Sequence, residues 1–242
     1  MDNVENRNPI CHDGTTALDL GVINGHLNIC KLILNNMTDK NISDDIGWTP
    51  LFNAAQYGHV EIYKFIMDKT KDKNPRNTDG RTALEFAVQN GHFEVCKLIL
   101  DNVKERNPAC NDGWTPLHSA AKNGHADIYK LIMETGIAYP NSILGSTPLY
   151  WAVKDSHFEV CQVILENLKD EIKKENYFEL LKIAAENQNL NIAQLLIKNL
   201  STQNLFPTPT RRDKFKLLEH AAITNNAEVA SIIIENIAKD GN

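Results

Sequence analysis

The sequence predicts an all-α-dominated fold, a solenoid in which helix-turn-helix units stack in one row and are joined by hairpin-like loops. The first observation behind this prediction is a periodic glycine, because Gly14, Gly47, Gly80, Gly113 and Gly145 open similar segments at spacings of 33, 33, 33 and 32 residues. The second is the helical spacing of apolar residues within each segment. The third is size, since one such segment cannot bury its own apolar face and needs stacked neighbours.

The segment from Asp112 to Met133, DGWTPLHSAAKNGHADIYKLIM, shows how each element is encoded. Thr115 is suited to cap a short first helix, and Pro116 is suited to its first turn, where no N–H is needed. Gly124 ends this helix, because glycine adopts a positive φ at little cost. A second helix follows, with Asp127 near its positive end and apolar residues at helical spacing. The predicted unit is therefore a helix, a Gly-His turn and a second helix.

Five segments carry this unit in register. They read DGTTALDLGVINGHLNIC, IGWTPLFNAAQYGHVEIY, DGRTALEFAVQNGHFEVC, DGWTPLHSAAKNGHADIY and LGSTPLYWAVKDSHFEVC. A period of 33 with Thr-Pro-Leu-His-x-Ala-Ala followed by Gly-His resembles the ankyrin repeat family. Two weaker copies, FELLKIAAENQNLNIAQLLI from Phe178 and FKLLEHAAITNNAEVASIII from Phe215, keep the Leu and Ala-Ala skeleton but lose Thr-Pro and Gly-His. The resemblance covers nearly all 242 residues.

This resemblance implies a single ankyrin-repeat domain over residues 1–242, made of seven repeats. Their approximate bounds are 11–43, 44–76, 77–109, 110–141, 142–173, 174–210 and 211–242. We expect nearest-neighbour stacking, rather than one large core, to stabilise the array. Because both ends of the sequence fall at a repeat boundary, we expect an excerpt of a longer array. The alternative is that the edge repeats cap the array through small sequence changes.

Composition excludes several function classes. The chain is 42% hydrophobic and 23% charged, with a net charge of −6, as expected of a folded protein. The negative charge and the scarcity of arginine argue against nucleic acid or an anionic membrane as a partner. No apolar run reaches the roughly 18–20 residues of a membrane span, and the start, MDNVENRNP, has no signal-peptide core. We therefore expect a monomer in the cytoplasm or nucleus, without membrane insertion.

The five cysteines are odd in number and include no CxxC spacing, which favours a reducing compartment. Cys30, Cys96 and Cys161 recur at one helix position in alternate repeats. Packed helices lie about 8–10 Å apart, so these sulfurs are too far apart to form disulfides. We expect all three to be small buried apolar side chains.

Histidine also recurs, at the turn between the two helices of each unit. The members are His26, His59, His92, His125 and His157. The family resemblance implies that these histidines form structural hydrogen bonds, and that His118 bonds to Thr115 at the start of its helix. No HExxH pair, paired-carboxylate site or Ser/His/Asp order remains once the repeat is subtracted. The prediction is a protein that is not an enzyme, with no catalytic residue, metal ligand or cofactor.

A second periodicity of two repeats runs through the predicted core. The residue that ends the Ala-Ala pair of the first helix alternates between valine and alanine: Val22, Ala55, Val88, Ala121 and Val153. One position of the second helix alternates between cysteine and tyrosine: Cys30, Tyr63, Cys96, Tyr129 and Cys161. A large residue accompanies a small one each time, as a close-packed interior requires. Duplication of a 66-residue double repeat would produce this alternation.

Three places depart from the pattern. The linkers KDKNP and KERNP lack the usual glycine, so the second helix is expected to run on for part of a turn before Asn74 or Asn107. The loop tip at Ile143 and Leu144 is apolar, and either contacts a partner or is covered by a neighbouring repeat. An insertion, LSTQNLFPTPTRRDKF, is expected to protrude as a tolerated surface segment or as a docking loop for an acidic partner. Its basic residues are Arg211, Arg212 and Lys214.

In ankyrin proteins, partners contact the loop tips and the inner face of the first helices. Carried onto this sequence, the implied partner-binding residues are Trp48, Gln56 and Tyr57 in repeat two, Arg81, Gln89 and Asn90 in repeat three, Trp114, Lys122 and Asn123 in repeat four, and Tyr150, Trp151 and Lys154 in repeat five. Aromatic residues and arginine are frequent anchors of interfaces. The alternative for the tryptophans after the loop glycines is that they cover the base of the hairpin.

The sequence therefore predicts a non-catalytic scaffold or adaptor that binds a partner protein through its loop tips and inner helix face. It does not identify that partner. The alternative is an excerpt of a larger ankyrin-containing channel, enzyme or ubiquitin-ligase adaptor, whose effector domain lies outside this sequence.

Overall fold

The computed structural model describes residues 15–40, 42–137, 139–140, 146–167 and 174–202, together with the single positions 227, 230, 231 and 234. Over these residues the chain forms twelve helices. The first helices of successive units are α1 (Ala17–Ile23), α3 (Pro50–Gln56), α5 (Ala83–Gln89), α7 (Pro116–Lys122), α9 (Pro148–Lys154) and α11 (Lys174–Glu186). The second helices are α2 (Leu27–Asn36), α4 (Val60–Lys69), α6 (Phe93–Asn102), α8 (Ala126–Met133), α10 (Phe158–Asn167) and α12 (Leu190–Thr202). The predicted helical solenoid is confirmed.

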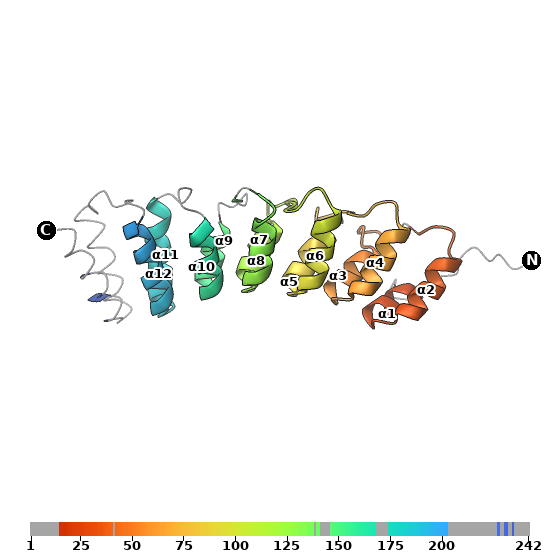
Figure 1. Ribbon diagram of the computed structural model, residues 1–242, viewed down its shortest axis with the longest axis horizontal. Coiled ribbons are helices and arrows are strands. Elements are labelled where there is room, and N and C mark those ends of the chain that lie inside the picture. The colour runs from red at the N-terminus through yellow and green to blue at the C-terminus, as the bar shows by residue number, and fades with distance from the viewer. Residues whose placement is uncertain are drawn as a thin grey trace, which may run out of the picture.

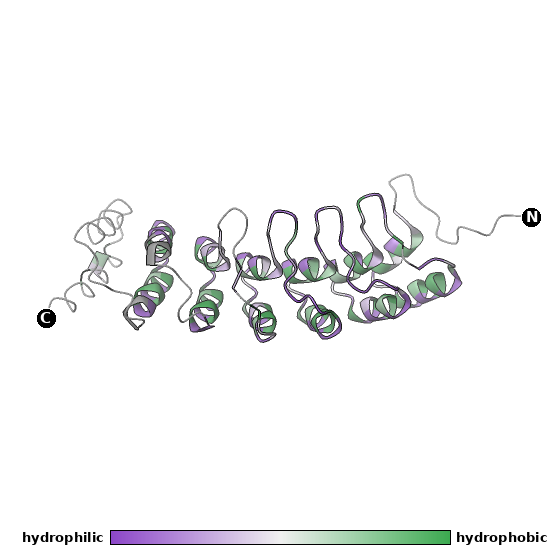
Figure 2. Cartoon of the chain, turned by 90° about the horizontal axis from the view of Figure 1, so that it is seen from above, coloured by the Kyte–Doolittle hydropathy of each residue, from purple (hydrophilic) through white to green (hydrophobic). Residues whose placement is uncertain are grey.

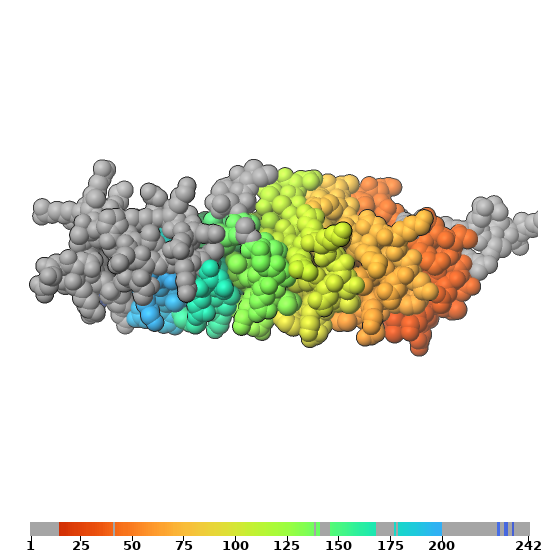
Figure 3. Space-filling view, turned by 45° about the horizontal axis from the view of Figure 1, so that its top comes forward, coloured from red at the N-terminus to blue at the C-terminus, as the bar shows by residue number. Residues whose placement is uncertain are grey.

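The helix pairs stack side by side in one elongated row (Figure 1). Each first helix packs against the first helices of the neighbouring units, and each second helix against the neighbouring second helices. Seen from above, two layers of helices result, and the connecting loops project beyond the first-helix layer on the side away from the second helices (Figure 2). In the space-filling view the coloured residues form one continuous elongated surface (Figure 3). Neighbour-to-neighbour packing is therefore what holds the described units together.

Helix α7 begins where the sequence predicts. Thr115 precedes α7 in an extended conformation, and Pro116 occupies the first turn. The backbone N–H of Thr115 donates to Nδ1 of His118 over 3.2 Å, and the Thr115 hydroxyl lies 2.9 Å from the same nitrogen. The predicted bond between these two side chains is confirmed. It ties the start of the helix to its own first turn.

The turn histidines connect each unit to the one before it. Nε2 of His59 lies 3.1 Å from the Ile23 carbonyl oxygen, and Nε2 of His157 lies 2.9 Å from the Lys122 carbonyl oxygen. Because a carbonyl only accepts, each ring nitrogen donates, and each bond caps the end of the preceding first helix. The structural role that the family resemblance implies for this histidine is confirmed. It bonds between units rather than within one.

The second helices differ in length according to their linkers. Helices α4 and α6 continue to Lys69 and Asn102, whereas α8, which precedes Gly136, ends at Met133. In register, α4 and α6 are two residues longer at this end, so the predicted extension is present but stops short of the asparagines. Asn107 instead accepts from the backbone N–H of Leu117 through its Oδ1, over 3.1 Å. Asn107 therefore satisfies a backbone N–H in the first turn of α7.

The core lies between the two helix layers, and it contains the alternating positions. All ten residues of the valine/alanine and cysteine/tyrosine series are fully buried. Burial raises the pKa of the Cys96 and Cys161 thiols to about 12, so both remain protonated. The expectation of small buried apolar cysteines is thus confirmed. The hydroxyls of Tyr63 and Tyr129 are buried without a hydrogen-bond partner among the described residues.

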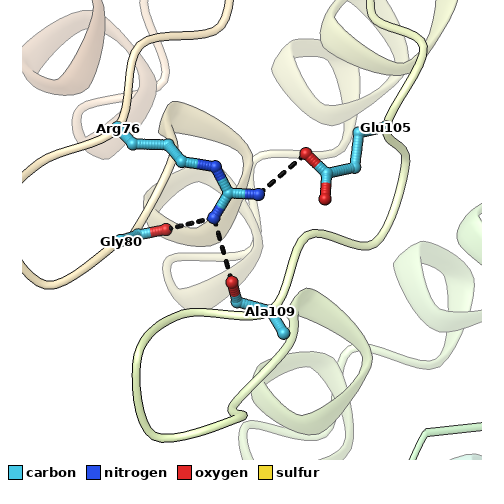
Figure 4. Close-up of polar contacts among 4 residues, drawn as sticks. All are labelled: Arg76, Gly80, Glu105 and Ala109. Carbon is cyan, nitrogen blue, oxygen red and sulfur yellow. Dashed lines mark hydrogen bonds and ion pairs between the residues drawn. The ribbon is translucent and has the colours of Figure 1, made fainter.

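The loops are also joined to one another. The guanidinium of Arg76 donates to the carbonyl oxygens of Gly80 and Ala109, over 2.7 and 2.9 Å, and forms an ion pair with Glu105 at 2.7 Å (Figure 4). Residue 76 lies before the third repeat, and residues 105 and 109 lie before the fourth. One side chain therefore fixes two successive loops relative to each other.

Several predicted features lie outside the described residues. They are the apolar loop tip Ile143 and Leu144, the basic residues Arg211, Arg212 and Lys214, and most of the seventh repeat at 211–242. The division into seven repeats therefore stays a prediction beyond the six helix pairs that the described residues form.

Candidate partner-binding surface

The twelve predicted partner-binding residues lie on the first helices, on the loop ends that lead into them, or at the residue directly after them. Six are exposed: Tyr57, Gln89, Asn90, Lys122, Asn123 and Lys154. Six are half-buried: Trp48, Gln56, Arg81, Trp114, Tyr150 and Trp151. The exposed members cluster where the first helices end. The half-buried aromatic residues cluster where the loops enter these helices or on the helices themselves.

Trp48 lies in a group of aromatic rings that spans two units. Its ring centroid is 5.2 Å from that of Phe52 in α3 and 4.6 Å from that of Phe86 in α5, the second pair in an edge-to-face arrangement. Its Nε1–H donates to Oδ1 of Asn53 over 2.8 Å, and the Asn53 amide donates to Asp19 in α1 over 3.0 Å. Trp48 therefore takes part in the packing of the array, and one face of its indole is committed to it.

Trp114 repeats this arrangement 66 residues later. Its Nε1–H donates to the Ser119 hydroxyl over 2.6 Å, and Ser119 donates to the carboxylate of Glu85 in the preceding unit. Its ring meets the ring of Trp151 in α9 edge-to-face, with centroids 5.2 Å apart. Trp114, Ser119 and Glu85 occupy the positions of Trp48, Asn53 and Asp19. The double-repeat periodicity of the core is therefore present at the surface as well.

The second cluster differs from the first by two lysines. The ammonium groups of Lys122 and Lys154 lie 4.9 and 4.8 Å from the ring centroid of Trp151. Lys122 is also 5.7 Å from the Trp114 ring, and Lys154 is 5.7 Å from the Tyr150 ring. At these distances the ring quadrupole attracts the cation. We call these five residues the aromatic–lysine cluster.

Arg81 occupies the repeat position of the two tryptophans, as predicted, but its surroundings differ. Its backbone N–H donates to Oδ1 of Asn77, and its Nε is buried without a partner among the described residues. The aromatic contacts of Trp48 and Trp114 are made with Phe86 and Trp151 on the following first helix. The structure thus brings together residues at different repeat positions, and sequence reasoning missed Phe86 as a member of this surface.

Two titratable groups beneath the surface have shifted pKa values. Burial raises the pKa of Glu85 above its usual range, although the hydrogen bond from Ser119 opposes the shift. Burial lowers the pKa of His118 to about 4. Nδ1 of His118 accepts from a backbone N–H, so its proton is on Nε2, which lies 3.2 Å from the Ser146 carbonyl oxygen. Neutral His118 is therefore a structural bridge between two units.

Histidine and acidic side chains are spread along the described residues. Among them, no group of three or more His, Cys, Asp or Glu side chains could hold a metal ion. Four of the turn histidines have Nε2 within hydrogen-bond distance of a backbone carbonyl oxygen: His59, His92, His125 and His157. What the surface offers instead is a row of exposed side chains and aromatic edges on a rigid helix layer.

Stacked helix pairs with loops on one side define a helical repeat protein that presents an extended binding surface. A family model described as ankyrin repeats (3 copies) matches residues 22–109 and 101–176. The chain belongs to the ankyrin repeat family. Ankyrin repeats are generally non-catalytic modules for protein–protein interaction. No curated protein compared with the chain matches it, and none of its described helices is long and apolar enough to cross a membrane.

Proposed function

We propose that this protein is a non-catalytic scaffold or adaptor that binds a partner protein through the inner face of its first helices and its loop tips. The observation that carries this proposal is the row of side chains at the ends of the first helices. Tyr57 is 45% exposed, yet the equivalent residues of the next two units are Asn90 and Asn123. Folding therefore does not require an aromatic residue there, whereas binding favours one.

The stacked first helices also suit this role energetically. Helices α3, α5, α7 and α9 are fixed by contacts with the first helices on both sides, and Arg76 fixes two of the loops. Side chains on such a layer lose little backbone freedom when a partner binds, which reduces the entropic cost of association. A partner that spans several units would contact several of the twelve predicted residues at once.

We further propose that the chain acts as a monomer in the cytoplasm or nucleus. Support for a reducing compartment comes from its thiols, because Cys30, Cys96 and Cys161 are buried and free. The net charge of −6 makes nucleic acid an unfavourable partner.

The test is quantitative capture from a cell lysate with matched variants. Tyr57→Ala combined with Gln89→Ala changes two exposed residues of the first helices, in repeats two and three. Lys64→Ala combined with Lys97→Ala changes two exposed residues of the second helices in the same repeats. We expect the first variant to lose captured proteins and the second to retain them, with equal melting temperatures. Equal capture by both variants would place the binding surface elsewhere.

A further inference from the structure

The array contains two aromatic clusters of similar geometry and different charge. In each, a tryptophan at the loop–helix boundary meets an aromatic residue of the following first helix edge-to-face: Trp48 with Phe86, and Trp114 with Trp151. In each, the indole N–H donates to a polar side chain of its own helix. The two clusters therefore share one architecture, and a difference between them is not imposed by the fold.

The difference lies at the last position of the first helices. From the second unit onward, successive units carry Gln56, Gln89, Lys122, Lys154 and Glu186 there. Glutamine is tolerated in two units, so helix packing does not require the lysines of the next two. The positive pair is confined to repeats four and five, and an acidic residue takes the position in repeat six. A bound segment would therefore contact basic helix ends in repeats four and five and an acidic helix end in repeat six.

The two lysines are held close together by one ring. Both ammonium groups lie within 4.9 Å of the Trp151 centroid, so their separation cannot exceed twice that distance. This upper bound is close to the Debye length of about 8 Å at physiological salt, so the repulsion between the two charges is only partly screened. Among the described residues, neither ammonium has a carboxylate oxygen within 4 Å. An anionic group near both would relieve this repulsion.

We propose, building on the protein-binding function above, that the aromatic–lysine cluster recognises an acidic segment of a partner protein, in which carboxylates flank an apolar side chain. The apolar side chain packs on the exposed edges of Trp114 and Trp151. The flanking carboxylates pair with Lys122 and Lys154, displacing or sharing their contacts with the ring. Charge complementarity selects this partner, because two lysines converge on one ring of a chain whose net charge is −6.

The cluster around Trp48 then serves as an internal reference. It has the same aromatic geometry, but its helix-end residues, Gln56 and Gln89, are neutral. An acidic segment gains nothing there beyond apolar contact. The selectivity of one cluster over the other therefore measures the contribution of the two lysines.

The experiment uses the full chain labelled with ¹⁵N and a peptide, Glu-Glu-Asp-Leu-Phe-Glu-Asp-Glu, as the probe. The three tryptophans give three indole N–H signals, which Trp→Phe variants assign. We expect the peptide to shift the signals of Trp114 and Trp151 and to leave that of Trp48 unchanged. We expect a peptide with every acidic residue replaced by its amide to bind at least tenfold more weakly. The affinity for the acidic peptide should fall as NaCl rises.

The decisive variant is Lys122→Gln with Lys154→Gln, which gives repeats four and five the residues of repeats two and three. It should weaken peptide binding at least tenfold without lowering the melting temperature. The matched control, Lys97→Gln with Lys130→Gln, removes the same charge from exposed positions of the second helices and should change binding less than twofold.

Several results would overturn the inference. They are equal binding of the amide peptide, equal shifts at Trp48, equal effects of the two lysine variants, or no binding of the acidic peptide. Tighter binding of an eight-nucleotide oligothymidine than of the peptide would assign the cluster to nucleic acid instead. The protein-binding proposal has its own test, since the capture experiment with Tyr57 and Gln89 variants leaves both lysines intact. That experiment can succeed where this one fails.

Discussion

Gly58 lies directly beneath the imidazole of His92 in the next unit. A Cβ atom on Gly58 would stand 2.6 Å from Nδ1 of that ring, well inside van der Waals contact. Nε2 of His92 lies 2.9 Å from the carbonyl oxygen of Gln56, two residues before the glycine. The glycine of one unit and the histidine of the next therefore form a single interlocking contact.

The break in this pattern supports the same conclusion. Ser156 takes the glycine position in repeat five, with a φ of 63°, and the following unit has Asn189 in place of the histidine. There, the side-chain amide of Asn187 donates to the Lys154 carbonyl oxygen over 2.8 Å. Since no imidazole covers position 156, a side chain fits. Glycine and histidine are lost together because each requires the other.

The first prediction tests this contact. Gly58→Ala should lower the free energy of unfolding by about 2 kcal/mol or more, because it adds left-handed strain of about 1–2 kcal/mol and also displaces His92. Ser156→Ala is the control, since that position already holds a side chain at positive φ. Its effect should stay within about 0.5 kcal/mol. Urea melts of both variants give the values, and a loss for Gly58→Ala as small as that for Ser156→Ala would contradict both the strain and the contact with His92.

The second prediction concerns the pH dependence introduced by His118. Its pKa is about 4 in the folded protein and about 6.5 in an unfolded chain, so the unfolded state binds more protons between these values. Stability should therefore fall as the pH drops from about 6.5 towards 4, by up to about 3 kcal/mol. His118→Gln removes this dependence. Denaturant melts at pH 7, 6, 5 and 4 should show the wild-type advantage over the variant shrinking with acidity, and a constant difference would contradict the assignment.

The third prediction has the opposite sign and concerns Glu85. Its folded pKa is raised by burial, so the folded state binds the extra proton and becomes more stable as the pH falls towards the ordinary value. Glu85→Gln keeps an acceptor for the Ser119 hydroxyl and removes the buried charge. The variant should be more stable than the wild type at pH 7, and this gain should vanish near pH 4.5. A variant that is less stable throughout would mean that the charged hydrogen bond outweighs desolvation.

The fourth prediction compares the buried Tyr129 with the half-buried Tyr139. The Tyr129 hydroxyl has no partner among the described residues, whereas that of Tyr139 accepts from the backbone N–H of Leu149 over 2.9 Å. Tyr129→Phe should therefore be neutral or stabilising, by up to about 1 kcal/mol. Tyr139→Phe should cost about 1–2 kcal/mol, because the Leu149 N–H loses its acceptor. Thermal melts of the two variants test the contrast, and a loss at Tyr129 equal to that at Tyr139 would point to a water bound to its hydroxyl.

Much of this fold could be predicted from the sequence because its determinants are local. The period of 33 residues fixes the register of the units. Thr115, Pro116 and Gly124 act within a few residues of the helix ends that they define. The bond between Thr115 and His118 spans only three residues. The stacking of the units could also be predicted, because each amphipathic unit must bury its apolar face against a neighbour.

The side-chain contacts of the surface could not be predicted in this way, because they join residues of different units. The sequence placed Trp48 and Trp114 in one row with Arg81, but it could not show that their rings pack on Phe86 and Trp151. Nor could it show that Ser119 connects Trp114 to the buried Glu85, 34 residues earlier. The offset between stacked units decides these contacts and the half-burial of both indoles. The sequence alone determined which units exist and where they begin, since those are local properties of the chain. Only the tertiary structure decided which of their side chains meet, because that depends on how neighbouring units are offset and on how much water this packing excludes.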